Sequence, residues 1–136
     1  MSSPIVAIFS SAAVAAMTVY SAAVASLYLN QDSLVFHPRP LNPTIEEALN
    51  GLAGAHPLEV TAGDGIRLKG WVVKREGESG TPAPLLLYFG GNAEEIGSYL
   101  LEASQYLGRW SIAALNYRGY GASQGSPGEQ ALLSDA

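Results

Sequence analysis

Residues 85 to 95 are the part of the sequence whose residue types are best suited to chemistry. The run Leu-Leu-Leu-Tyr-Phe-Gly-Gly-Asn-Ala-Glu-Glu takes an apolar strand into Gly90 and Gly91 and then, at Asn92, into the start of a helix. Strand and helix do not use every backbone N–H of such a turn, so these groups can point together at an oxygen that gains negative charge. The pattern predicts an oxyanion-hole turn. An ordinary turn that uses glycine for its dihedral freedom is the alternative.

One serine stands in a nucleophile-like motif. Residues 121 to 125, Gly-Ala-Ser-Gln-Gly, satisfy the Gly-x-Ser-x-Gly pattern. A nucleophile elbow needs a buried strand that delivers the serine onto a tight turn, with a helix beginning at once. Residues 118 to 120 separate the preceding strand from the motif, and the next helix is capped only at Ser126. We therefore interpret Ser123 as a loop residue and not as the nucleophile.

The sequence lacks the groups that would assist a nucleophile. It holds two histidines, His37 and His56, each followed by a proline, and we interpret both as linker or loop residues. Asp135 is the only acid near the end of the chain, so no serine, base and acid of a Ser-His-Asp triad can be assigned. With no cysteine, and no histidine beside a carboxylate at ligand spacing, we predict no metal and no cofactor.

Composition limits the number of domains and the class of partner. With 136 residues, the chain is long enough for one domain at most. It carries 7 basic and 12 acidic residues, a formal net charge of −5, and no cluster of Lys or Arg. Nucleic acids and anionic membrane surfaces are recognised by clustered positive charge, so we predict neither as a partner.

The first 31 residues carry no charged side chain. Residues 4 to 29 are long enough to cross a bilayer, which takes roughly 20 apolar residues in a helix. We predict a single-pass N-terminal membrane anchor with the lipid bilayer as its partner. The alternatives are a cleaved signal peptide, because residues 23 to 25 (Ala-Val-Ala) resemble a cleavage site, and a buried helix of a soluble protein. Arg39 is the only basic residue nearby, so the sequence leaves the side of the membrane open.

Residues 30 to 56 are expected to form a linker with a short helix. The first part holds three prolines and is predicted to be extended. Thr44 and Glu47 match a capping box, which predicts a helix that ends near Gly51.

The pattern of residues 57 to 136 predicts an incomplete α/β domain. Residues 58 to 61 and 66 to 73 are expected to form an edge hairpin around Gly63-Asp64-Gly65. Residues 85 to 89 do not alternate, which favours a strand buried on both faces.

A crossover and a last helix are expected to follow. Asn92 and Glu95 form a second capping box, predicted to open a helix, and residues 111 to 116 supply another buried strand. Strand, helix and strand make a right-handed βαβ crossover with parallel strands. Residues 126 to 129, Ser-Pro-Gly-Glu, are predicted to open a final helix. The expected apolar face of the crossover helix is Ile96, Tyr99, Leu100, Ala103 and Leu107, with Gly108 at its end.

This order of elements resembles the first half of an α/β hydrolase. The resemblance is closest to membrane-anchored bacterial serine hydrolases related to the BEM46 and ABHD13-like group. It covers nearly the whole chain, including the exit segment 29 to 38, and is sharpest over residues 88 to 95 and 116 to 127. It implies the N-terminal half of an α/β-hydrolase sheet, hairpin plus βαβ crossover, preceded by a transmembrane helix.

The resemblance also implies roles for individual residues. The family's turn is usually His-Gly-Asn, in which the residue after the glycine donates its backbone N–H to the oxyanion hole. By position, Gly90 replaces the histidine, a bracing side chain, while Gly91 keeps the glycine and Asn92 becomes the donor. The family's serine follows the fifth strand, and this sequence has no such strand. The loop near the site, implied to contact substrate, is Tyr117, Arg118, Gly119 and Tyr120.

Two hypotheses follow for function. The first is the N-terminal fragment of a membrane-tethered serine hydrolase for an ester or related acyl substrate, with the oxyanion turn but without the triad, so that the 136 residues alone are inactive. The second is a catalytically silent, membrane-anchored binding or assembly module. A phosphate site at the Gly-Gly-Asn turn is weaker, because no lysine follows it as in a P-loop. The substrate stays open among peptide, ester, thioester and lipid.

Overall fold

The computed structural model describes residues 4–77 and 81–135. It divides into two compact units, Met1–Val35 and Phe36–Ala136. The first unit contains helix α1 (Pro4–Leu29) and the short helix α2 (Gln31–Val35). α2 corrects the expectation of an extended linker after α1, because the Asn30 carbonyl accepts the N–H of Leu34 at 3.1 Å and the hydroxyl of Ser33 at 2.8 Å. These bonds close a further helical turn that proline spacing does not predict.

Helix α1 has the length and composition of a membrane span. The segment Ser11–Leu29 has a mean hydropathy of 1.7, and none of it is buried within the structure. Its apolar side chains are therefore available to lipid, although a signal sequence near an N-terminus has the same properties.

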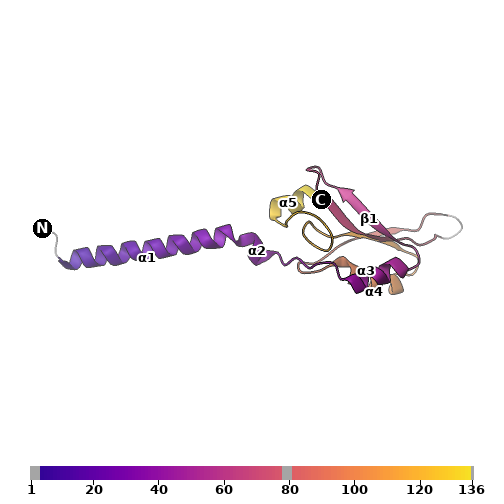
Figure 1. The fold of residues 1–136 in the computed structure, drawn as a ribbon, viewed down its shortest axis with the longest axis horizontal. Coiled ribbons are helices and arrows are strands. Elements are labelled where there is room, and N and C mark those ends of the chain that lie inside the picture. The colour runs from indigo at the N-terminus through magenta and orange to yellow at the C-terminus, as the bar shows by residue number, and fades with distance from the viewer. Residues whose placement is uncertain (1–3, 78–80, 136) are drawn as a thin grey trace. The chain divides into compact units, whose positions relative to one another are not determined.

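The second unit is built on a four-stranded sheet (Figure 1). Its strands are β1 (Ala55–Thr61), β2 (Arg67–Val73), β3 (Leu85–Phe89) and β4 (Ser111–Leu115), in the spatial order β1-β2-β4-β3. β1 and β4 each pair antiparallel with β2, whereas β3 and β4 run parallel. The predicted α/β class, edge hairpin and βαβ crossover are confirmed.

Helices cover the sheet unequally. α3 (Pro43–Gly51) and α4 (Ile96–Tyr106) lie together on one face, and α5 (Glu129–Asp135) lies on the other (Figure 1). α4 turns the predicted apolar residues Ile96, Leu100 and Ala103 inward. The core between the sheet and helices α3 and α4 consists of Leu49, Trp71, Val73, Ile96, Leu100, Ala103, Ile112 and Ala114.

Strand β3 is buried on one face only, so the prediction of burial on both faces is wrong. Leu86 and Tyr88 pack against the core, whereas Leu85, Leu87 and Phe89 are 54%, 64% and 66% exposed. Of the helices described in this unit, α3 and α4 pack against the face of β3 that carries Leu86 and Tyr88, and the opposite face at Leu85 and Leu87 stays exposed. An unbroken apolar run therefore does not by itself report burial on both sides.

Two predicted helix starts are also wrong. α3 is capped by Asn42, whose side-chain oxygen accepts the N–H of Thr44 at 3.0 Å, with Pro43 as the first helical residue. This is the usual arrangement of an Asn cap followed by proline. α5 begins at Glu129, three positions after the predicted cap Ser126.

Candidate functional site

The turn after β3 has a defined and strained geometry. The N–H of Glu94 donates to the carbonyl of Gly91 at 3.2 Å, which closes a four-residue turn. Ala93, the third residue of the turn, has φ 75°, whereas Asn92 is not in the positive-φ region. That combination is the signature of a type II turn, in which glycine usually takes the third position. An alanine there costs about 1–3 kcal/mol, a strain typical of functional turns.

The Glu94 carboxylate braces this turn. It accepts the N–H of Gly91 at 2.7 Å, and its two oxygens lie 2.9 and 3.0 Å from the hydroxyl of Tyr88. The Tyr88 ring stacks on Tyr99, with ring centroids 3.7 Å apart. Burial, and then the hydrogen bond to Glu94, raise the pKa of Tyr88 to about 12. The turn is therefore held by a carboxylate from its own C-terminal end.

Gly90 lies in a space that suits the absence of a side chain. A Cβ at this position would come 3.0 Å from the Cγ2 of Ile96 and 3.8 Å from the Oε2 of Glu94. A larger side chain would need Ile96 to move and would crowd the carboxylate brace. Glycine at position 90 and Glu94 thus form one consistent arrangement of the turn.

Asn92 joins the turn to two distant segments. Its side-chain oxygen accepts the hydroxyl of Tyr120 at 2.9 Å and the backbone N–H of His37 at 3.2 Å. The same N–H of His37 lies 3.1 Å from the Tyr120 hydroxyl oxygen, and Tyr120 is only 1% exposed. His37 was expected to be a linker residue. No sequence signal could reveal its place here, because the contact uses its backbone.

The cap of α4 comes from Asn116, not from Asn92 as predicted. The Oδ1 of Asn116 accepts the N–H of Ile96 at 3.1 Å, and its Nδ2 donates to Glu95 at 3.1 Å. Asn116 directly follows β4 and is buried. Asn92 is not available as a cap, because its side chain is directed to Tyr120. Gly121 allows this arrangement, since a Cβ there would come 2.2 Å from the Nδ2 of Asn116.

The segment after Phe36 runs along the loop that follows β4. The N–H of Gly121 donates to the carbonyl of Arg39 at 2.7 Å, and the N–H of Leu41 donates back to Gly121 at 3.3 Å. Pro40 and Gly121 form a parallel bridge. These bonds hold the segment against the loop at the same end of the sheet as the Gly-Gly-Asn turn.

Arg118 ties the loop to two other elements. Its Nε lies 2.7 Å from Asp135 on α5, its Nη2 also pairs with Asp135, and its Nη1 lies 2.9 Å from Asp64 in the β1–β2 turn. The Arg118 hydrogen bond lowers the pKa of Asp64, and both carboxylates raise the pKa of Arg118. The guanidinium is thus already engaged by two carboxylates. A direct contact of Arg118 with substrate stays a prediction.

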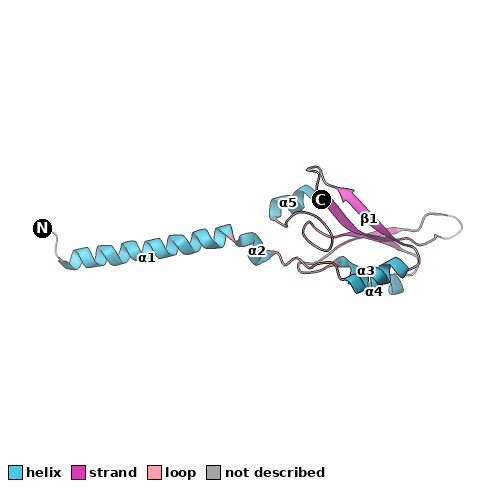
Figure 2. Cartoon of the chain, viewed as in Figure 1, coloured by secondary structure: helices cyan, strands magenta, loops and turns pink. Residues whose placement is uncertain are grey.

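Ser123 is a loop residue, as predicted. It lies between β4 and α5, outside both elements. Figure 2 shows that the chain enters α5 from a loop. Its hydroxyl accepts the N–H of Lys69 at 2.8 Å and donates to the carbonyl of Asn116 at 2.9 Å. The hydroxyl therefore fastens the loop to β2. A nucleophile elbow requires a helix that begins directly after the serine, whereas α5 begins only at Glu129.

An apolar cavity of about 270 Å³ opens beside the carboxyl ends of β3 and β4. In open α/β sheets, ligands bind outside these strand ends. Of the loop residues predicted to contact substrate, Tyr117 lines the cavity, and its ring meets Tyr120 edge to face with centroids 6.1 Å apart. Gly119 has φ 81° and shapes the loop. The lining is Leu68, Phe89, Leu115, Asn116, Tyr117, Leu132, Leu133 and Asp135.

Comparison with known proteins identifies relatives of this chain. No family model matches the chain. It is 31% identical over 130 residues to the alpha/beta hydrolase domain-containing protein WAV2 of Arabidopsis thaliana, an alignment that covers 85% of this chain and 38% of WAV2. The chain is a homologue of α/β-hydrolase proteins. It therefore spans well under half the length of this relative.

Two further comparisons concern a solved structure and a yeast relative. The Pyrococcus furiosus esterase Pf2001 matches this α/β-hydrolase homologue with a TM-score of 0.50 over 69% of this chain and 35% of that chain, at 18% identity. That likeness shows the fold alone. An uncharacterized membrane protein of Saccharomyces cerevisiae is 35% identical over 81 residues, which cover 58% of this chain and 27% of the yeast protein.

Proposed function

We propose that these residues form the N-terminal part of a membrane-tethered serine hydrolase of the BEM46 and ABHD13-like group, which acts on an ester or related acyl substrate. In this proposal the chain contributes the oxyanion-hole turn, and the serine, acid and base belong to sequence that follows it. The comparison with WAV2 supports this division, because the matched part is 38% of that protein. The 136 residues alone are then inactive.

The observation that carries the proposal is the braced turn at the carboxyl end of β3. Glu94 holds Gly91, and Tyr120 holds Asn92, so the turn keeps its shape without substrate. Preorganised donors are what oxyanion stabilisation requires, and removing one typically costs about 3–4 kcal/mol of transition-state stabilisation. We assign the donor role to the backbone N–H of Asn92. Gly90 and Gly91 complete the turn.

The remaining parts of the proposal follow from the helix and the apolar cavity. α1 supplies the membrane tether, supported by the mean hydropathy of 1.7 over Ser11–Leu29. The apolar cavity supplies a surface for the acyl group, with Phe89 and Tyr117 on its wall. An acyl chain has the matching chemistry, since burial of apolar surface is its main source of affinity.

The nucleotide sequence downstream of codon 136 tests the proposal most directly. We expect a further strand, then Gly-x-Ser-x-Gly on an elbow, and later an Asp and a His. If none of these elements follows, the hydrolase proposal fails and the silent binding module takes its place.

The donor assignment has its own experiment in the complete protein. Asn92→Pro removes the backbone N–H, and proline is favoured at the second position of a type II turn. Asn92→Ala is the matched control, because it loses the same side-chain bonds but keeps the N–H. We expect the proline variant to lose about 100-fold to 1,000-fold in kcat for a small ester relative to the alanine variant. Equal activity of the two variants would remove Asn92 from the oxyanion hole.

A further inference from the structure

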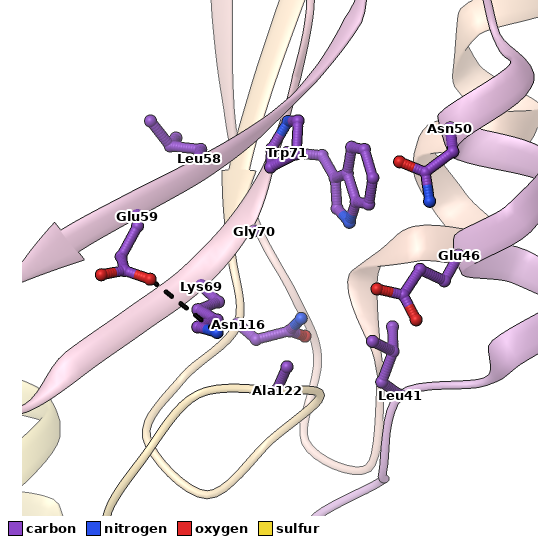
Figure 3. Close-up of a pocket in the computed structure, with 11 residues that line it drawn as sticks. Leu41, Glu46, Asn50, Leu58, Glu59, Lys69, Gly70, Trp71, Asn116 and Ala122 are labelled. Carbon is purple, nitrogen blue, oxygen red and sulfur yellow. Dashed lines mark ion pairs between the residues drawn. The ribbon is translucent and has the colours of Figure 1, made fainter.

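A second cavity lies between α3 and the β1–β2 hairpin, on the α3 side of the sheet (Figure 3). We call it the α3 cavity, and its volume is about 190 Å³. α3 contributes Glu46 and Asn50, and β2 contributes Lys69 and Trp71. No residue of the proposed oxyanion turn lines this cavity, so a ligand bound there would occupy a site separate from the proposed hydrolase site.

Trp71 gives the α3 cavity a hydrogen-bond donor. The side chain belongs to the core cluster and Trp71 is only 6% exposed, yet its indole nitrogen points into the cavity (Figure 3). Among the residues that the structure describes, none accepts a hydrogen bond from this N–H. The nitrogen is nevertheless not sealed off, because no fully buried side-chain nitrogen in the described chain lacks a partner. Water can therefore reach this N–H, and a ligand hydroxyl that enters the cavity can accept its hydrogen bond in place of water.

Glu46 supplies the matching acceptor. Its carboxylate faces the same space as the indole nitrogen, beside the amide of Asn50 (Figure 3). Lys69 pairs with Glu59 at 3.8 Å at the rim, which leaves Glu46 without a cation among the described lining residues. The cavity therefore presents one neutral donor and one charged acceptor to whatever enters it.

We propose that the α3 cavity binds a small, neutral, polyhydroxylated molecule of the glycerol or monosaccharide class. A hydroxyl group both donates and accepts, so one or two hydroxyls satisfy the indole N–H of Trp71 and the carboxylate of Glu46 together. An ammonium ion as the ligand would pair with Glu46, but it only donates and so cannot accept the hydrogen bond of the indole N–H. An anion is opposed by Glu46 and Glu59. Leu41 and the indole ring give the C–H faces of a polyol an apolar surface.

The two tryptophans of residues 1 to 136 allow a direct test. Trp71 and Trp110 each give one indole N–H signal in a ¹H–¹⁵N spectrum, assigned with Trp110→Phe. Trp110 is 44% exposed and lies outside the α3 cavity, so it serves as the internal control. The chain is held in micelles of a detergent without a sugar headgroup. Glycerol and glucose are titrated in separate experiments. We expect a saturable shift of the Trp71 signal with at least one of them, and no saturable shift of Trp110.

Variants of α3 and two other probes sharpen the test. Glu46→Ala should weaken the apparent affinity about tenfold, since a hydrogen bond to a charged group is lost. Glu47→Ala, on the same helix but outside the lining, should leave it unchanged. The proposal is overturned if neither polyol gives saturation, if both indole signals move linearly together, or if tetramethylammonium or sulfate saturates the Trp71 shift instead. It is equally overturned if Glu46→Ala folds normally and binds as well as Glu47→Ala.

Discussion

The hydroxyl of Tyr120 donates a 2.9 Å hydrogen bond to the side-chain oxygen of Asn92, which lies 28 residues earlier in the chain. The bond connects the loop after β4 to the turn after β3, at the carboxyl ends of two parallel strands. Because Tyr120 is buried, the bond is shielded from competing water and can position the turn.

Removing this hydroxyl should loosen the turn. We expect Tyr120→Phe to lower the free energy of unfolding by about 1 kcal/mol, because the Asn92 oxygen loses a donor and the His37 N–H loses an acceptor. Urea unfolding followed by tryptophan fluorescence measures the change. Tyr117→Phe is the matched control on the same loop, since its contact with Tyr120 is made by the ring. A loss as large in the control would assign the effect to the loop in general.

Tyr88 should ionise later than an ordinary tyrosine. Its pKa is raised from 10.0 to about 12, first by burial and then by Glu94, so the neutral phenol is favoured in the folded state. The stabilisation is present below pH 10 and is lost as the pH rises through about 12. Absorbance at alkaline pH, compared with that of a Tyr88→Phe variant, should show that Tyr88 ionises late.

The carboxylate of Glu94 accounts for part of this shift. Glu94→Gln removes the charge, so the pKa of Tyr88 should fall toward its ordinary value while remaining raised by burial. Glu102→Gln, at an exposed position on α4, is the control and should change nothing. If the late-titrating phenol persists unchanged in Glu94→Gln, the brace described for the turn is wrong.

The α4 cap distinguishes Asn116 from Asn92. Asn116→Ala should cost about 1–2 kcal/mol, because the N–H of Ile96 and the side chain of Glu95 both lose a partner. Hydrogen exchange at the first turn of α4 should accelerate in this variant. Asn92→Ala should leave the exchange of that turn as it is, since Asn92 makes its bonds elsewhere. If Asn92→Ala accelerated the exchange of that turn and Asn116→Ala did not, Asn92 would be the cap of α4, as the sequence predicts.

Arg118 should contribute an acid-sensitive part of stability. The pKa of Asp64 is lowered by Arg118, so the folded state favours the charged carboxylate. This stabilisation is complete above the ordinary value of 3.8 and is lost as the pH falls through the lower folded value. Asp64→Asn should therefore lower the urea midpoint at pH 7 and flatten its dependence on pH below about 4.

The exposed pair of Glu59 and Lys69 supplies the control for the Arg118 prediction. Both side chains are about half exposed and their atoms lie 3.8 Å apart, so Glu59→Gln should leave the midpoint at pH 7 close to that of the unchanged chain. Arg118→Lys should behave like Asp64→Asn or worse, because one ammonium cannot reach two carboxylates in the geometry of the guanidinium fork. If neither Asp64→Asn nor Arg118→Lys changes the midpoint, the ion pairs of Arg118 make no net contribution to stability.

Local pattern determined much of this protein. The apolar run of α1, the Gly63-Asp64-Gly65 hairpin, the crossover from β3 through α4 to β4, and the loop position of Ser123 were all predictable. Each depends on neighbours in the chain, through hydrophobic period, turn residues or the distance from a strand to a helix.

Only the tertiary structure decided which groups meet at the site. Asn116 caps α4 from the end of another strand, and the backbone of His37 reaches Asn92 across 55 positions. Leu87 is exposed because α3 and α4 pack against the opposite face of β3, which the composition of the strand does not reveal. A hydrogen bond or a buried face requires a partner in space, and sequence period reports only which way a residue points along its own element.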